Sequence, residues 1–326
     1  MIAVTGATGF LGADLVARLL RTTAEPVVAL VRAEDDEAAQ VRLDAALAPL
    51  GVFGARAIAG DVTDPATAFP DAVTAVVHCA ADVAFDRPLD EARAINVDGT
   101  RNVLAAAQRL PRLDRFVHVS TAFVSGRHPG TFGEHDGDLG QTHRNTYEQT
   151  KLEAELVVRA SNLPVCVVRP SIVVGDSLTG WTSSFNVLYF PLQAYARGLV
   201  TRIPGDPSAL VDIVPVDHVT DVIVAALAPS CPHQTLHAVA GEAAPTAGEL
   251  AALASRVLGR PPIEFGTATD LADALDVYFP YFTVRGHFDA TRARALGLRP
   301  PRLEDYFDRL IDYANLTRWG RRPISV

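Results

Sequence analysis

The 326-residue chain is 48% hydrophobic and 21% charged, which is typical of a globular protein with a large core in one large domain or two coupled lobes. Its net charge of −9 and pI near 5.5 argue against a nucleic-acid partner, because such binders normally carry a basic face. The three cysteines form no metal-ligand spacing, so we expect no metal site and a reducing compartment. We see no signal peptide and no run of 18 apolar residues, and therefore expect a cytoplasmic protein without a transmembrane segment.

Short β-branched runs alternate with helical patterns through the first half of the chain. The predicted strands are, in order, IAVT, VVALV, AIAG, AVVHCA, FVHVS and VCVVR. Helices are expected from about residue 11, over 37–50, over 89–109 and around Tyr147. This alternation predicts an α/β fold with a doubly wound parallel sheet, the Rossmann arrangement, in which ligands bind at the carboxyl ends of the strands.

The stretch TGATGFLG, residues 5–12, joins the first predicted strand to the first helix. Gly6, Gly9 and Gly12 stand where the backbone of a dinucleotide-binding turn must bend tightly, approach a pyrophosphate and pack against the sheet. The helix N-terminus then faces the phosphates. The spacing is G-x-x-G-x-x-G rather than G-x-G-x-x-G, so tight-turn glycines without a ligand are the alternative. With the tyrosine–lysine pair described below, we interpret the stretch as a dinucleotide site.

The end of the second predicted strand decides between two cofactors. An acid about 20 residues past the glycines would bind the ribose of NAD. Arg32 occupies that place and can receive the 2′-phosphate of NADP, so we expect NADPH, with a solvated residue at the start of a helix as the alternative. Asp61, in GDVTDP, is placed to meet the adenine, although an Asx turn before Pro65 would also explain it.

Lys151 is the single lysine in a chain with 28 arginines, and it lies four residues after Tyr147 in NTYEQTKLEAE, residues 145–155. In a helix this spacing places both side chains on one face. An ammonium is a compact charge that a guanidinium cannot replace, and a nearby cation is expected to lower the tyrosine pKa from ~10. We interpret the pair as an acid–base catalyst rather than as a solvent-facing lysine placed by chance.

After Pro170 the alternation loosens into a substrate-binding lobe. We predict an NADP-binding domain over 1–175, with 211–241 returning to the sheet, and a lobe formed by 176–210 and 242–326. Within the lobe, FNVLYFPLQAYARGLV (185–200) fits an apolar ligand pocket and ordinary core equally well. His118, between two valines of a strand, is expected to be a hydrogen-bonded structural histidine.

Residues 285–326 form a basic C-terminal arm. The arm has nine arginines and five acids, a net charge of +4, while the remainder of the chain carries −13. We expect either that the arm steers an anionic partner or that its arginines pair with neighbouring acids on a solvated face.

These motifs together resemble the extended short-chain dehydrogenase/reductase superfamily, in which TGATGFLG, GDVTDP, HCAA, NVDGT, VSTAFV, YEQTK and RPSIVVG occur in the same order. The resemblance implies a catalytic triad of Thr121, Tyr147 and Lys151 with a supporting Asn96. The cofactor contacts expected from the glycine turn and from the resemblance are Gly6, Thr8, Gly9, Phe10, Leu11, Gly12, Arg32, Asp61, Val62, Ala80, Ala81, Tyr147, Lys151, Pro170 and Ile172.

Further segments resemble the branch that reduces acyl thioesters, namely fatty acyl-CoA reductases and the terminal reductase domains of carboxylic acid reductases and of peptide or polyketide synthetases. They are VRAEDDEAAQVRLDAAL, FVHVSTAFVSG, RPSIVVGDSLTGW, RGLVTRIPGDPSALVDIVPVDHV and YFPYF followed by FDATRARALGL. The resemblance implies NADPH-dependent reduction of an acyl-CoA or acyl-carrier thioester to the aldehyde, with further reduction to the alcohol left open.

Because no adenylation or carrier domain is fused to the chain, an acyl or peptidyl carrier protein would act in trans. The alternatives are a reductase or dehydrogenase of ketones, sterols or nucleotide sugars, and a non-catalytic NADP-binding regulator.

Overall fold

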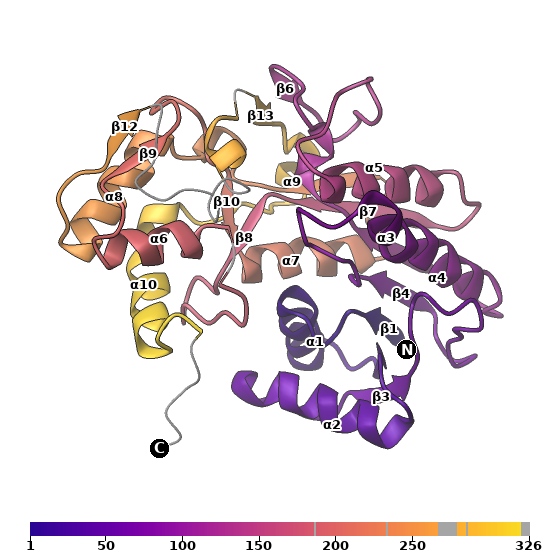
Figure 1. Cartoon of the computed structure of the whole chain (residues 1–326). Coiled ribbons are helices and arrows are strands. Elements are labelled where there is room, and N and C mark those ends of the chain that lie inside the picture. The colour runs from indigo at the N-terminus through magenta and orange to yellow at the C-terminus, as the bar shows by residue number, and fades with distance from the viewer. Residues whose placement is uncertain (186, 233, 267–278, 285, 321–326) are drawn as a thin grey trace.

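Seven parallel strands form the central sheet of the molecule (Figure 1). The computed structural model describes residues 1–320 except 186, 233, 267–278 and 285. The strand order β3-β2-β1-β4-β5-β7-β11 confirms the predicted doubly wound parallel sheet, because the chain returns from β3 to the other side of β1. The strands are β1 (Ile2–Thr5), β2 (Val27–Val31), β3 (Arg56–Ala59), β4 (Ala75–His78), β5 (Arg115–Val119), β7 (Val165–Pro170) and β11 (Thr235–Ala238).

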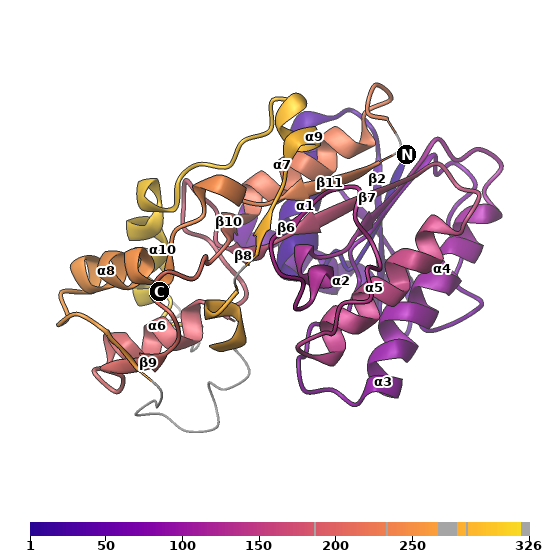
Figure 2. The ribbon, with the colours of Figure 1, turned by 90° about the horizontal axis from the view of Figure 1, so that it is seen from above.

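Helices cover both faces of this sheet. The first face carries α1 (Phe10–Thr22), α2 (Asp36–Leu47) and α7 (Val216–Leu227). The opposite face carries α3 (Leu89–Arg93), the π-helical turn η2 (Ala94–Asp98), α4 (Gly99–Gln108) and α5 (Thr146–Arg159). Figure 2, seen from above, shows α3, α4 and α5 together on one side of the sheet.

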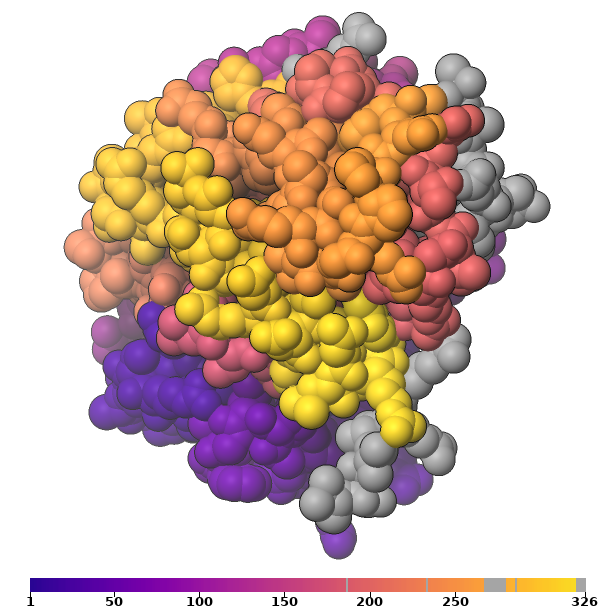
Figure 3. All heavy atoms as spheres, turned by 90° about the vertical axis from the view of Figure 1, so that its left-hand side faces the viewer, coloured from indigo at the N-terminus to yellow at the C-terminus, as the bar shows by residue number. Residues whose placement is uncertain are grey.

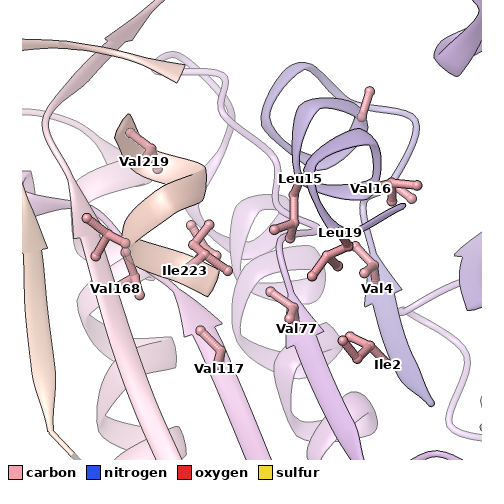
Figure 4. Packing of buried hydrophobic residues seen from close by; sticks show 14 of the residues in the cluster. Ile2, Val4, Leu15, Val16, Leu19, Val77, Val117, Val168, Val219 and Ile223 are labelled. Atoms are coloured by element: carbon pink, nitrogen blue, oxygen red, sulfur yellow. The ribbon is translucent and has the colours of Figure 1, made fainter. Parts of the chain in front are cut away.

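The two faces are assigned by alternation along each strand, because successive side chains of a strand point in opposite directions. Ile2 and Val4 of β1 pack with Leu15 of α1 and Ile223 of α7 (Figure 4). Ala3, which lies between them, belongs instead to the cluster beneath α4 and α5. The strands are therefore buried on both sides, as parallel strands require.

A second lobe lies beside the carboxyl ends of the strands and contains α6 (Tyr189–Ala196), α8 (Ala247–Leu258) and α10 (Phe307–Leu316) (Figure 1). Figure 3 looks onto its outer face, where the orange segment that contains α8 lies beside the yellow segment that contains α10. All seven sheet strands come from 1–175 and 211–241, and the three lobe helices come from 176–210 and 242–320.

Short elements connect these units. Three two-stranded parallel pairs are formed by β8 with β10, β9 with β12 and β6 with β13. Their bounds are β6 (Thr131–Phe132), β8 (Ile172–Val174), β9 (Arg202–Pro204), β10 (Ile213–Pro215), β12 (Glu264–Gly266) and β13 (His287–Phe288). The short helices are η1 (Ala48–Leu50), η3 (Ala122–Ser125), η4 (Gly241–Ala243), η5 (Phe279–Phe282), α9 (Thr291–Ala295) and η6 (Leu303–Asp305).

A buried ion-pair network fastens α5 to the sheet. The Glu155 carboxylate accepts hydrogen bonds from Arg169 of β7 at 2.5 and 3.0 Å, and from Arg159 at 2.7 and 3.0 Å. Ser120, just after β5, donates a further bond to it at 2.9 Å. Burial alone would raise the pKa of Glu155, but the charges and hydrogen bonds of the two arginines outweigh burial and lower it. The carboxylate is therefore ionised at neutral pH.

Replacement of Glu155 by Gln should leave the fully buried Arg169 without its counter-ion. We expect Glu155→Gln to lower the free energy of unfolding by roughly 3 kcal/mol, measured by denaturant titration at neutral pH. The matched control is Glu153→Gln on the same helix, whose pair with Arg93 is partly exposed and should contribute less than about 1 kcal/mol.

The same pair makes a prediction about pH. A carboxylate whose folded pKa is lowered stabilises the protein above its ordinary pKa, and this contribution disappears as the pH falls through the lower folded pKa. The difference between the parent and Glu155→Gln should therefore shrink in acid. Equal losses in the two glutamine variants, or a difference independent of pH, would contradict this account.

Candidate active site

The glycine turn between β1 and α1 is closed too tightly for any side chain. Gly6 has a φ of 71°, and a Cβ built on it would lie 2.7 Å from the Ala80 nitrogen. A Cβ on Gly12 would lie 2.1 Å from the Gly6 carbonyl oxygen. Both contacts are shorter than packed atoms allow, so the turn requires glycine at these two positions.

The N-terminus of α1 fits an anionic group. Gly9 is the N-cap and has no side chain that could occupy the first amide groups, and the first turn of α1 contains no acidic residue. Exposed amide groups and the helix dipole together favour a phosphate at such a position. Thr8, Phe10 and Leu11 are half-buried in the same turn. The residues present therefore fit the pyrophosphate of a dinucleotide.

Arg32 and Asp61 lie at the same edge of the sheet, just after β2 and β3. Arg32 is exposed, and the Arg42 guanidinium of α2 donates a hydrogen bond to the Arg32 carbonyl oxygen. Two arginines therefore lie just after the carboxyl end of β2. Sequence reasoning missed Arg42, whose position depends on how α2 packs against β2. Asp61 accepts bonds from the Thr63 amide and hydroxyl, both at 2.9 Å, which is the Asx turn considered as an alternative.

A buried chain of hydrogen bonds ties the glycine turn to the segment after β4. Thr5 bonds His78 at 2.7 Å, and His78 bonds Thr100 of α4 at 3.0 Å. The Ala80 amide donates to the Thr5 hydroxyl at 3.2 Å, which fixes the start of the Ala80–Ala81 segment. Burial lowers the pKa of His78 to about 3, so its ring is neutral. His78 was not among the predicted site residues, although it stands in the HCAA motif.

Asn96 acts within the protein scaffold. Its side chain accepts from the Asp82 amide at 2.8 Å, and donates to the Asp82 carbonyl at 3.0 Å and to the Thr150 hydroxyl at 2.9 Å. These bonds connect the π-helical turn η2 to the loop after β4 and to α5. Val62 packs in turn against Gly99, at the start of α4. In this structure Asn96 therefore ties together three elements that border the predicted site.

The hydroxyl groups of Thr121 and Tyr147 are neighbours in the structure. Thr121 follows β5 and donates to the carbonyl oxygen of Pro170 at 3.3 Å. Tyr147 is the second residue of α5, whose N-cap Asn145 accepts from the Glu148 amide at 2.9 Å. Ile172, two positions after Pro170 in the sequence and the first residue of β8, is also buried. The ends of β5 and β7 and the start of α5 thus meet at the predicted triad.

Lys151 is buried on the same helix, and its ammonium donates to the Val119 carbonyl oxygen at 2.7 Å. Burial lowers its pKa to about 8. Burial raises the pKa of Tyr147 to about 12, against a smaller opposite effect of the Thr121 hydroxyl. The predicted lowering of the tyrosine pKa is therefore wrong for this structure, because desolvation outweighs the favourable contacts.

His118 is fully buried beside His78, with 5.5 Å between the ring centroids. Neither of its ring nitrogens has a hydrogen-bond partner among the residues that the structure describes. Burial lowers the pKa of His118 far below its usual value. The histidine is thus part of the core as predicted, but the expectation that it is hydrogen-bonded was wrong.

An apolar cavity of about 40 Å³ lies in the second lobe between α6 and α8. Residues 188–200 of the ambiguous segment supply Leu188, Pro191, Leu192, Tyr195 and Val200 to its wall. The Tyr195 hydroxyl donates to the Pro261 carbonyl oxygen at 2.6 Å, so its polar atom is already bonded within the protein. Leu188 and Leu192 also belong to the core of the lobe. The segment is therefore both core and pocket wall.

Two arginines of the basic arm, residues 285–326, form ion pairs with nearby acids. Arg294 pairs with Glu242 at 3.5 Å and Arg302 with Glu304 at 2.9 Å, as expected for a solvated face. Arg285, Arg321 and Arg322 lie outside the described residues. Steering of an anionic partner by the arm stays a prediction.

Within the described ranges, no three His, Cys, Asp or Glu side chains are grouped to hold a metal ion. Of the helices in the part of the chain that the structure describes, none has the length and apolar character needed to cross a bilayer.

Comparison with known structures relates the whole fold to two kinds of enzyme. The terminal R domain from the myxalamid PKS-NRPS biosynthetic pathway superposes with a TM-score of 0.83 and 24% identity, over 99% of this chain and 92% of the R domain. UDP-glucuronic acid 4-epimerase from Bacillus cereus, in complex with NAD, superposes with a TM-score of 0.74 and 20% identity, over 98% and 99%. At this level of identity the likeness concerns the fold.

Sequence comparison is more specific. Mouse fatty acyl-CoA reductase 2 is 30% identical over 275 residues, which are 69% of this chain and 53% of the mouse protein. Human fatty acyl-CoA reductase 1 is 30% identical over 276 residues, or 69% and 54%. The chain thus spans about half the length of the curated relatives it matches.

A family model described as male sterility protein matches residues 4–223, from β1 through the glycine turn and the Tyr147 helix into α7. The matched range includes every residue predicted for the catalytic and cofactor sites. This match and the two relatives confirm the family resemblance that the motifs indicated, and the chain belongs to the male sterility protein family, which is related to the fatty acyl-CoA reductases.

Proposed function

We propose that this protein is an oxidoreductase that reduces an acyl thioester with a nicotinamide cofactor. The observation that carries the proposal is the meeting of Thr121, Tyr147 and buried Lys151 at the strand ends beside the glycine turn. Membership of the family and the likeness to fatty acyl-CoA reductases support a thioester as substrate. The family relationship alone would not identify the reacting groups.

We further propose that the cofactor is NADPH. The glycine turn and the N-terminus of α1 would receive its pyrophosphate, and Arg32 with Arg42 would receive the 2′-phosphate. When bound, the cofactor supplies the hydride. Ala80, Ala81, Pro170 and Ile172 would border its nicotinamide half, as the resemblance implies.

The protein groups act on the carbonyl oxygen of the thioester. As hydride adds to the carbonyl carbon, negative charge would develop on this oxygen, and the Tyr147 and Thr121 hydroxyls would donate hydrogen bonds to it. The raised pKa of Tyr147 keeps its proton in place at neutral pH, so Tyr147 acts as the general acid. The resulting hemithioacetal expels the thiol and leaves the aldehyde. A second reduction would give the alcohol.

We propose that the apolar cavity between α6 and α8 receives the end of the acyl tail. Apolar side chains dominate its wall, and such a wall suits a hydrocarbon chain. A nucleotide sugar would need polar groups for its hydroxyls, which argues against the activity of the epimerase whose fold is similar. The thiol half of the substrate would be coenzyme A or a carrier protein supplied in trans.

A substrate panel tests this proposal directly. Oxidation of NADPH should depend on acyl-CoA thioesters and proceed slowly or not at all with ketones, sterols or UDP-sugars. Product identification by mass spectrometry then separates aldehyde from alcohol. Activity confined to ketones or UDP-sugars would reject the thioester assignment. Binding of NADPH without turnover of any substrate would favour the alternative of a non-catalytic NADP-binding regulator.

Tyr147→Phe should lower kcat by roughly 100-fold or more while cofactor binding stays within a few-fold of the parent, because only the transferred proton is lost.

Lys151→Arg should also lose activity, since a planar guanidinium cannot occupy the site of the ammonium. In the parent, kcat/KM should fall as the pH rises through about 8, where Lys151 loses its charge. Normal turnover in Tyr147→Phe or in Lys151→Arg would reject a catalytic role for that residue. A kcat/KM that stays constant well above pH 8 would mean that the charge of Lys151 is not needed.

Arg32→Asp should raise the KM for NADPH by about tenfold or more, through loss of a charge-assisted phosphate contact and added repulsion. The KM for NADH should change much less. Arg56→Asp is the matched control, because this exposed arginine lies at the amino end of β3, on the opposite edge of the sheet. Equal use of NADH and NADPH by the parent would contradict the cofactor assignment.

Ala251→Leu should shorten the acyl chain that the protein accepts. Ala251 lines the cavity, and leucine would occupy space for about two methylene groups, each contributing ~0.8 kcal/mol of apolar burial. The KM for long-chain substrates should rise about tenfold while that for short chains stays constant. Ala252→Leu, on the exposed side of α8, should change neither. If Ala251→Leu changed the KM for all acyl chain lengths by the same factor, the acyl tail would bind outside this cavity.

A further inference from the structure

Tyr281 reaches from the second lobe to the first turn of α5. It belongs to η5 and is only 2% exposed. Its hydroxyl accepts a hydrogen bond from the Asn145 side chain at 2.8 Å, and burial together with the nearby Glu148 carboxylate raises its pKa. Asn145 is the N-cap of α5, and Glu148 is the residue whose amide that cap receives. The Tyr281 hydroxyl therefore bonds one partner of the cap and lies near the carboxylate of the other.

The cap is tied down on its other side by an almost fully buried ion pair. Glu148 accepts from the Arg144 amide at 2.9 Å and from its guanidinium at 3.2 Å. The same guanidinium lies over the Tyr281 ring, 5.9 Å from its centroid. Tyr281 thus lies against the Asn145 cap and against the ion pair of Arg144 with Glu148. Tyr147 is the second residue of that turn.

The Tyr281 ring provides a second connection to Tyr147. It stacks on Phe85 with 5.2 Å between ring centroids, and Phe85 in turn packs against the Tyr147 ring at 5.9 Å. Phe123, directly after the Thr121–Ala122 pair, meets the Tyr281 ring edge-on at 4.8 Å. The proton donor is therefore bordered by an aromatic cluster whose central member comes from the lobe.

The next residue in η5 joins this cluster to the apolar cavity. Phe282 is buried and forms part of the cavity wall together with Leu188 and Ala251. Because Tyr281 and Phe282 share one tight 3-10 turn, a displacement of Phe282 is transmitted to Tyr281. The cavity and Tyr147 are thus linked through Phe282, Tyr281 and Phe85.

We propose that Tyr281 is a positioning residue, which holds Tyr147 in its reactive orientation and couples that orientation to filling of the apolar cavity. The inference rests on the proposed role of Tyr147 as proton donor. Tyr281 itself need not contact the reacting atoms. An acyl tail that presses on Phe282 would tighten the contacts of Tyr281 with Phe85 and with the cap of α5, so a long tail should be reduced faster than a short one.

Tyr281→Phe tests the hydroxyl alone, because the ring and its stacking remain. We expect kcat with a long-chain thioester to fall about tenfold, the effect of losing one buried hydrogen bond, while the KM values for thioester and cofactor stay within twofold. The parent's preference in kcat for long over short acyl chains should disappear. Tyr313→Phe is the matched control, since it removes the hydroxyl of a partly buried tyrosine of α10 and should leave both constants unchanged.

Hydrogen exchange gives a readout that does not require activity. In Tyr281→Phe, amides of the segment 145–151 should exchange about tenfold faster, while the central strands exchange as in the parent. Phe85→Leu, which removes the ring contact, should lower kcat without this change in exchange. If the parent reduces no thioester, the proposed function fails, whereas the exchange result still decides whether Tyr281 holds α5.

Three results would overturn the proposal. A kcat within twofold of the parent in Tyr281→Phe would mean that the hydroxyl does not position Tyr147. Faster exchange throughout the sheet would mean that Tyr281 stabilises the fold generally. An unchanged preference for long acyl chains, despite a lower kcat, would mean that the cavity is not coupled to Tyr147 through this residue.

Discussion

The buried carboxylate of Glu155 fixes the position of α5, and the candidate site depends on that position. Two arginines and Ser120 share its oxygens, so the helix is fastened to the neighbouring strands β5 and β7. Lys151, one helical turn earlier, is anchored to β5 by the Val119 carbonyl oxygen. These contacts leave the first turn of α5, with Tyr147, at the carboxyl ends of the strands, where ligands bind in such folds.

Burial gives Tyr147 and Lys151 opposite changes of pKa. Desolvation penalises the charged form of each group, so it raises the pKa of the phenol to about 12 and lowers that of the ammonium to about 8. The reduction needs a proton on the tyrosine. The two shifts together meet this need, because Tyr147 stays protonated over the whole pH range in which Lys151 loses its charge. The site therefore favours acid catalysis without a phenolate in the resting protein.

The sequence was sufficient for the features that depend on local spacing. The glycine turn, the alternating strands and helices and the i, i+4 relation of Tyr147 and Lys151 were all predicted, and the fold and the family were confirmed. The pKa of Tyr147 was predicted in the wrong direction because it depends on burial by distant segments. The contact between Asn145 and Tyr281 joins residues 136 positions apart, and no local pattern indicates it.

The chemistry itself is tested most directly in a single turnover that follows two signals at once. The protein with bound NADPH is mixed with an acyl thioester, and loss of NADPH absorbance is recorded together with appearance of the thiol. We expect thiol release only as NADPH is consumed, with one thiol for each NADPH in this first turnover. When NADPH is then supplied in excess, the ratio should stay at one thiol for each NADPH if the aldehyde is the product and become one for every two if the alcohol is. NADPH consumption without thiol release would contradict this expectation.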